Sequence, residues 1–209
     1  MKKRIPAVFP AFFVLLWISP FGRGQISGSP HDFSGSSWNG SGEICVVCHT
    51  PHNSDTAAAG APLWNHRVTT ATFTLYSSRT LVVQPEQPRG VTRLCLSCHD
   101  GTVALDSFGG MTGNTFISGD ANLGTNLSDD HPVSIKWKHQ NRNPARQLPN
   151  CFNCHKRGGW RPITSELPFF DGYVECATCH DPHNGTSGYG HLLRKTLAGS
   201  RLCLHCHRK

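Results

Sequence analysis

The sequence of 209 residues lacks the signatures of several enzyme classes. It has no Gly-x-Ser-x-Gly motif and no glycine loop suited to phosphate, which argues against serine hydrolase and nucleotide chemistry. It also has no apolar stretch long enough to favour a membrane-spanning helix, since the mostly apolar run at 5–18 is too short. Methionine is scarce, with Met1 and Met111 as the two copies.

All ten cysteines belong to five copies of the motif Cys-x-x-Cys-His. The cysteines are Cys45 and Cys48, Cys95 and Cys98, Cys151 and Cys154, Cys176 and Cys179, and Cys203 and Cys206. This spacing is the attachment motif of haem c, in which both thiols form thioethers to the haem and the histidine binds the iron. The sequence therefore predicts five covalently attached haem c groups. Their proximal iron ligands would be His49, His99, His155, His180 and His207.

Three other uses of paired cysteines fit the sequence less well. A disulfide framework, common in short secreted chains, does not require a histidine after every second cysteine. Ten cysteines with five regularly placed histidines do not divide cleanly into four-ligand zinc sites. A thioredoxin-type redox pair would account for one motif at most. Because every cysteine is committed to a motif, no spare thiol is left to act as a nucleophile.

Residues 1–24 have the order of a secretory signal peptide, because Lys2, Lys3 and Arg4 precede the apolar run and small residues follow it. We expect cleavage near Gly24, with a retained membrane anchor as the alternative. The protein would then be exported to the periplasm or the cell surface, with no membrane span in the mature chain. Residues 25–44, rich in Gly and Ser, are expected to form a flexible lead-in.

The formal net charge of +7 does not predict a nucleic-acid partner. About four of these charges would leave with the signal peptide, and haem propionates would balance others. The C-terminal stretch is basic through Arg194, Lys195, Arg201, Arg208 and Lys209. We interpret these charges as partners of propionates or as solvated groups, with docking of an acidic redox partner as the alternative.

The chain has little material for a conventional core, because 21 glycines and 14 prolines leave few packing residues for each predicted haem. The haem faces would supply the apolar surface instead. We therefore predict a fold with few secondary structures: loops, short α-helices at the attachment motifs and minimal β-structure, packed around a chain of haems. A short strand is expected around 73–76, and a turn into a short helix over 186–193.

The chain contains an internal repeat. The sequence Cys-His-Thr-Pro-His-Asn at 48–53 returns as Cys-His-Asp-Pro-His-Asn at 179–184, and 93–99 matches 201–207. We predict a single pentahaem domain over 45–209. It would consist of two-haem units at 45–99 and 176–207, with a one-haem insertion at 100–175.

Axial ligands decide whether each iron is a closed electron carrier or an open reactive site. Because methionine is nearly absent, each iron must have a second histidine or an open face. His52 and His183 each follow a proximal histidine by three residues, so we expect each to bind the iron of a neighbouring haem. His131 follows two carboxylates that could hold its free ring nitrogen, which suits an iron ligand.

The other histidines are less constrained. His31 lies in the lead-in and could bind a haem of its own chain or of the next subunit. His139, His66 and His191 are candidates for the fifth distal position, and His139 is favoured because it lies near the third motif. His205, between the cysteines of the last motif, is expected to face solvent.

Longer strings of residues resemble those of bacterial multihaem cytochromes of the doubled Cys-x-x-Cys-His class, at 45–53, 62–65, 94–104 and 127–132. Within that class the chain is similar to the tetrahaem cytochromes whose subunits stack into extracellular filaments. The resemblance implies bis-His ligation by the positions His31, His52, His131 and His183. The third motif is a departure from the tetrahaem pattern and adds a fifth haem.

Together these features predict an electron carrier rather than an enzyme. It would pass single electrons along closely packed bis-His haems between redox proteins, or to an extracellular acceptor. A haem reductase with one open distal site is an alternative, opposed by the short chain, the absence of a Cys-x-x-Cys-Lys site and the surplus of histidines. A third interpretation is a subunit of a homo-oligomer or cytochrome filament, with His31 binding a haem of the next copy.

Overall fold

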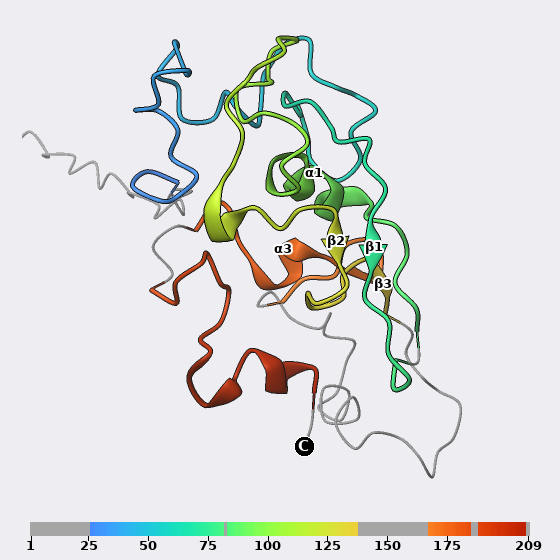
Figure 1. Ribbon diagram of the computed structural model, residues 1–209. Coiled ribbons are helices and arrows are strands. Elements are labelled where there is room, and N and C mark those ends of the chain that lie inside the picture. Colours follow the sequence, from blue (N-terminus) through green and yellow to red (C-terminus); the bar gives the residue numbers. More distant parts are fainter. Residues whose placement is uncertain (1–25, 82, 138–166, 185–187, 208–209) are drawn as a thin grey trace, which may run out of the picture.

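The computed structural model describes residues 26–81, 83–137, 167–184 and 188–207, and most of them form turns and extended loops. Figure 1 shows this path, with few regular elements along it. The prediction of a loop-rich fold with short helices and minimal β-structure is confirmed. The predicted signal peptide, the third attachment motif (Cys151, Cys154 and His155) and His139 lie outside the described residues.

Helical turns coincide with the attachment motifs. Helix α1 spans Gly90–His99 and helix α3 spans Cys176–Cys179, so they carry the second and fourth motifs. The 3-10 helices are η1 at Gly119–Ala121, η2 at Ala198–Ser200 and η3 at Cys203–His205, of which η3 belongs to the fifth motif. The first motif is a single turn, in which the N–H groups of Cys48 and His49 donate to the carbonyl of Cys45 at 3.2 and 2.8 Å. A turn of this kind brings both thiols and the imidazole to one side of the chain.

The β-structure consists of two pairs of two-residue strands. β1 (Thr74–Leu75) pairs in parallel with β2 (Asn126–Leu127), and β3 (Ile135–Lys136) pairs antiparallel with β4 (Tyr173–Val174). β1 confirms the strand expected around 73–76. Because β3 and β4 flank the span that contains the third motif, the two sides of that span meet in this pair.

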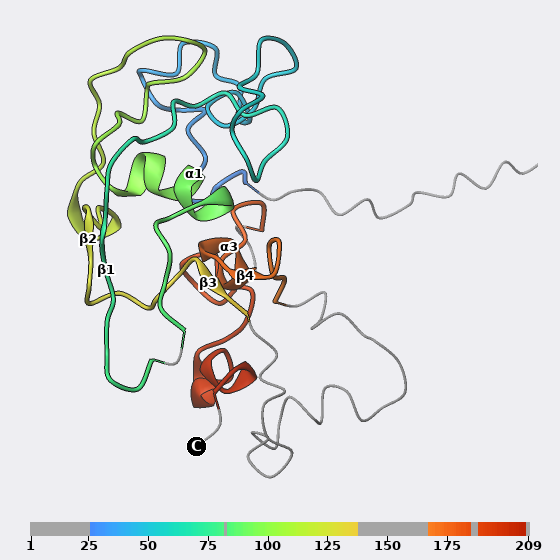
Figure 2. The same ribbon diagram turned by 90° about the vertical axis from the view of Figure 1, so that its right-hand side faces the viewer.

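The largest cluster of buried apolar side chains is small. Phe73, Leu96 and Leu127 pack together beside β1, α1 and β2, with Leu96 only 1% exposed. Both ribbon views place α1 directly over α3, with the C-terminal turns on the other side of α3 (Figures 1 and 2). The helices that carry the second and fourth motifs are therefore in contact. In the described part of the chain, no helix has the length and apolar character needed to cross a membrane.

The helix expected over 186–193 is wrong for the residues described there. Residues 188–193 form turns and bends. His191 and Leu192 have φ angles of 45° and 56°, which a right-handed helix does not allow. A backbone bridge between His180 and Leu193 holds this segment against the fourth motif instead.

Candidate haem-attachment sites

The histidines of three attachment motifs are held by the same kind of hydrogen bond. Nδ1 of His49 lies 2.8 Å from the carbonyl oxygen of Pro62, Nδ1 of His99 lies 2.8 Å from that of Ala121, and Nδ1 of His180 lies 2.7 Å from that of His191. A carbonyl only accepts, so Nδ1 carries the proton in each ring. Nε2 then presents a lone pair, which is the form of histidine that binds a metal.

The first and fourth motifs are built alike beyond the residues that match in sequence. Leu63 and Leu192 both have a left-handed backbone, with φ angles of 54° and 56°. In the first unit Thr50 donates to the carbonyl of Leu63 at 2.9 Å, and in the fourth Asp181 donates to that of Leu192 at 2.7 Å. The chain after each motif thus returns antiparallel to the motif and delivers the carbonyl that orients its histidine. The sequence did not predict these carbonyl acceptors, because the backbone of any residue type can supply them.

Three attachment histidines lie beside a second histidine. The pairs are His49 with His183 (ring centroids 6.1 Å apart, planes at 25°), His99 with His31 (6.0 Å, 67°) and His207 with His131 (6.2 Å, 74°). A metal ion between two imidazoles needs two metal–nitrogen bonds of about 2.0–2.1 Å. Adding the distance from each nitrogen to its ring centre gives a centroid separation of about 6 Å. The three pairs therefore fit an iron bound on both faces.

The remaining described histidines that could bind iron do not form such ring pairs. Among the described residues, no imidazole ring contacts the ring of His180, and His52 is exposed without a ring contact. His66 is 2% exposed, and its Nδ1 and Nε2 lie 2.9 and 3.1 Å from the carbonyl oxygens of Arg67 and Ala104. Those contacts give His66 a packing role between the first two-haem unit and the segment that follows it.

His205 is partly buried, contrary to the expectation that it faces solvent. Its Nδ1 lies 3.3 Å from Nζ of Lys195, an arrangement in which the ammonium group donates. This contact ties the fifth motif to the basic segment before it. Arg194, next to Lys195, forms an ion pair with Asp181 at 2.9 Å and so belongs to the fourth motif. Part of the basic C-terminal stretch therefore forms contacts with other residues of the same chain.

His31 is positioned by an ordered turn of the lead-in. The carboxylate of Asp32 accepts hydrogen bonds from the backbone of Gly28 at 2.7 Å and from the backbone and hydroxyl of Ser34 at 3.2 and 2.5 Å. Burial lowers the pKa of His31 to about 4, and the neighbouring His99 contributes to the shift. The ring is consequently neutral at physiological pH, as an iron ligand must be.

The thiols of different motifs lie close together. The thiol of Cys95 hydrogen-bonds that of Cys176, and this contact together with burial raises the pKa of Cys95. Burial raises the pKa of Cys48 to about 11 and that of Cys98 to about 12. Cys48 of the first motif is also an electrostatic neighbour of Cys98 in the second. The contact of Cys95 with Cys176 therefore brings the second and fourth attachment motifs together.

Other arrangements of the cysteines are not seen in the described residues. The eight cysteines described there are all free of disulfides. The same part of the chain contains no group of three or more His, Cys, Asp or Glu side chains arranged to hold a metal ion by themselves. The donor set is instead a pair of thiols followed by an oriented imidazole, which suits thioether attachment of haem.

A buried donor beside the first motif also fits a haem. The ring of Trp64 meets that of His49 edge-on, with centroids 6.1 Å apart and planes at 89°. Trp64 is 9% exposed, and its Nε1 has no acceptor among the described residues. Buried donors normally have a partner. A haem propionate is an acceptor of the right charge for this position.

Comparison with known families agrees with this chemistry. Residues 168–209 match the family model of the doubled CXXCH motif, which covers the fourth and fifth attachment motifs and about a fifth of the chain. No curated protein matches the sequence significantly. The family match supports a haem-binding c-type cytochrome that transfers electrons.

Proposed function

We propose that the protein is an exported pentahaem c-type cytochrome that passes single electrons along closely packed haems, each bound by two histidines. The observation that carries this proposal is that three attachment histidines lie beside a second histidine at 6.0–6.2 Å. A haem, when bound, supplies a one-electron redox centre. Histidines on both faces of an iron keep small molecules away from it, so these residues favour electron transfer over substrate chemistry.

In this proposal the distal ligands follow from the pairs. His183 serves the haem of His49, His31 that of His99, and His131 that of His207. His52 follows the first motif as His183 follows the fourth, so we assign His52 to the haem of His180 by the symmetry of the repeat. His139 is proposed for the haem of His155 on sequence grounds alone.

The contacts between thiols support a continuous series of haems. Cys48 of the first motif is a neighbour of Cys98 in the second, as its electrostatic effect on that thiol shows. Cys95 of the second motif contacts Cys176 of the fourth, and Cys203 of the fifth motif likewise influences Cys179. Haems attached at these positions would lie in the order first, second, fourth and fifth. In such a series, an electron could pass from one haem to the next without a substrate molecule between them.

We further propose that the electrons pass to or from other redox proteins, or to an acceptor outside the cell. His31 lies beside His99 of its own chain, which supports a unit whose second haem is complete without another copy. A filament of these subunits is the alternative. In it, contacts other than His31 ligation would join the copies.

The test is the mass of the purified protein together with electron paramagnetic resonance of its ferric form. A mass that includes five haems and a spectrum that is entirely low-spin is the expected result. A high-spin signal from about one haem in five would overturn the bis-His proposal, and the reductase alternative would then be favoured. A mass without haem would overturn the cytochrome proposal itself.

A further inference from the structure

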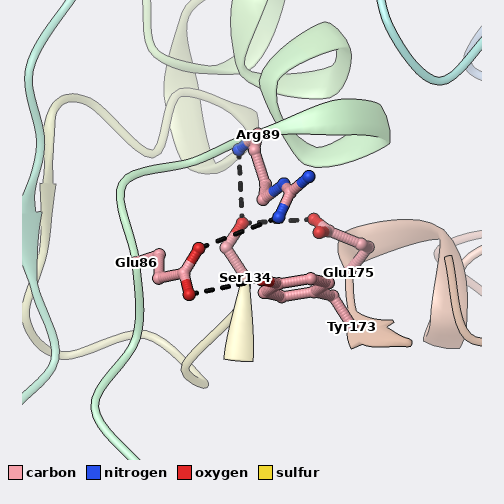
Figure 3. A network of polar contacts seen from close by, with 5 residues as sticks. All are labelled: Glu86, Arg89, Ser134, Tyr173 and Glu175. Atoms are coloured by element: carbon pink, nitrogen blue, oxygen red, sulfur yellow. Dashed lines mark hydrogen bonds and ion pairs between the residues drawn. The ribbon is translucent and has the colours of Figure 1, made fainter. Parts of the chain in front are cut away.

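The carboxyl group of Glu175 is buried between the two helices that carry the second and fourth motifs. Glu175 is 2% exposed and directly precedes Cys176, the first residue of α3. Its Oε2 accepts a hydrogen bond from the hydroxyl of Ser134 at 3.2 Å. Figure 3 shows this carboxyl group pointing toward Ser134, with α1 on one side and α3 on the other. Burying a charged carboxylate costs free energy, so a carboxyl group in this position is expected to have a structural or functional role.

Thr92 connects this carboxyl group to both helices. Its hydroxyl accepts a hydrogen bond from the backbone N–H of Cys176 at 3.0 Å, and Thr92 also donates to Glu175 from its side chain and its backbone. Thr92 is the third residue of α1, so Glu175 satisfies a free N–H group at the start of that helix. Cys95 lies one turn further along α1 and contacts Cys176. The carboxyl group is thus directly linked to the places where two haems are attached.

The charges around Glu175 do not fix it as a carboxylate. Arg89 is the cation that faces it from the N-cap of α1, but this guanidinium also pairs with Glu86 at 3.8 Å and lies 4.3 Å from the ring centre of Tyr173. From β3, Lys136 lies 5.9 Å from the ring of Tyr173 rather than at the carboxyl group. The attachment thiol of Cys176 is a further titratable neighbour of Glu175, and thioether formation would remove it.

Burial outweighs these favourable contacts and raises the pKa of Glu175 above its ordinary value of 4.5, although hydrogen bonds from Thr92 and Ser134 oppose the shift. Glu175 is therefore a buried carboxyl group that is suited to gain and lose a proton.

We propose that Glu175 takes up a proton when the haems attached through Cys95 and Cys176 are reduced, which couples proton uptake to electron transfer at this haem pair. The inference rests on the proposed function. When a one-electron donor protein delivers one electron to the pair, the local positive charge falls by one. The Glu175 carboxylate then gains one proton from solvent and forms one O–H bond, which restores the charge for that one electron. Re-oxidation by the acceptor returns the proton to solvent.

The sign of the pH dependence follows from linkage. Reduction raises the pKa of the carboxyl group, because a nearby positive charge is lost. Between the two pKa values of the oxidised and reduced protein, the midpoint potential of the pair falls as pH rises, by up to about 59 mV per pH unit. Below and above this window the potential does not change with pH through Glu175.

The experiment is a spectroelectrochemical titration of the haem-loaded protein from about pH 5 to about pH 9, comparing the wild type with Glu175→Gln. The wild type should show the pH slope in part of its potentials, and Glu175→Gln should lose that component. The matched control is Glu43→Gln, which removes an exposed carboxyl group two residues before Cys45 and should keep the slope. An identical slope in Glu175→Gln would overturn the proposal.

Two further measurements keep the test decisive if Glu175→Gln folds poorly. Ser134→Ala keeps the carboxyl group but removes a hydrogen bond to its ionised form, so the pH window should move upward. An unmoved window would contradict the proposal. Redox-difference infrared spectra of the wild type should gain the C=O band of a protonated carboxyl group on reduction, and its absence would overturn the proposal. A protein with five low-spin haems and no such effect leaves the proposed function intact, whereas a protein without haems removes both.

Discussion

The imidazole ring of His183 lies almost parallel to that of His49, with centroids 6.1 Å apart and planes at 25°. Removing His183 should therefore open one iron. We expect His183→Ala to retain five haems by mass and to convert about one haem in five from low-spin to high-spin, because the second ligand is lost while both thioethers remain. Electron paramagnetic resonance of the ferric protein measures this directly.

The matched control is His191→Ala. It removes an exposed imidazole but keeps the backbone carbonyl that accepts from Nδ1 of His180. Its spectrum should stay fully low-spin. A fully low-spin His183→Ala protein would contradict the assignment of His183, and a high-spin signal in His191→Ala would instead make His191 a ligand.

The symmetry of the repeat gives a second prediction. If His52 serves the haem of His180 as His183 serves that of His49, His52→Ala should also open one iron. The double variant His52→Ala, His183→Ala should show twice the high-spin signal of either single variant, since two different irons lose a ligand. A double variant with the signal of His183→Ala alone would place His52 outside the ligand set.

His31 provides a third prediction, because it lies 6.0 Å from His99 of its own chain. A wild-type sample diluted until it is monomeric should stay low-spin at every iron. His31→Ala should be partly high-spin at every protein concentration. The measurement is the spin state across a dilution series, with the assembly state followed by light scattering. A wild-type protein that gains a high-spin signal on dilution would show that the ligand comes from a neighbouring copy.

The parts of this protein that could be predicted from sequence are those that repeat. The Cys-x-x-Cys-His spacing needs both thiols and the imidazole on one side of a helical turn, and α1 and α3 form at these motifs. The scarcity of packing residues predicted the loop-rich fold, and the cluster around Leu96 is correspondingly small. These features depend on residue type and local spacing, which a single sequence displays.

Other features depend on which segments meet in space. The carbonyl groups of Pro62 and Ala121 orient histidines 13 and 22 residues away, and a carbonyl leaves no mark in the sequence. The buried position of Glu175 also escaped prediction, because it arises from the contact of α1 with α3. The helix expected over 186–193 was wrong for the described residues 188–193, because the left-handed backbone at His191 and Leu192 serves the fourth motif.

A fourth prediction concerns the contact between α1 and α3. Thr92→Val keeps the shape of the side chain but removes the hydroxyl that accepts from the N–H of Cys176 and donates to Glu175. Because Thr92 is fully buried, water cannot replace either partner. We expect the free energy of unfolding of the haem-loaded protein to fall by about 1–3 kcal/mol.

Denaturant titration followed by circular dichroism in the haem bands measures this loss, with an unchanged slope showing that the same surface is exposed on unfolding. Thr74→Val is the control, since Thr74 is an exposed residue of β1 and its replacement should change the free energy by no more than about 0.5 kcal/mol. Equal midpoints for the two variants would contradict a stabilising role of Thr92.

Thr92→Val also removes a hydrogen bond that lowers the pKa of Glu175. Thr92→Val should therefore also move the pH window of the haem potentials upward, in the same direction as Ser134→Ala.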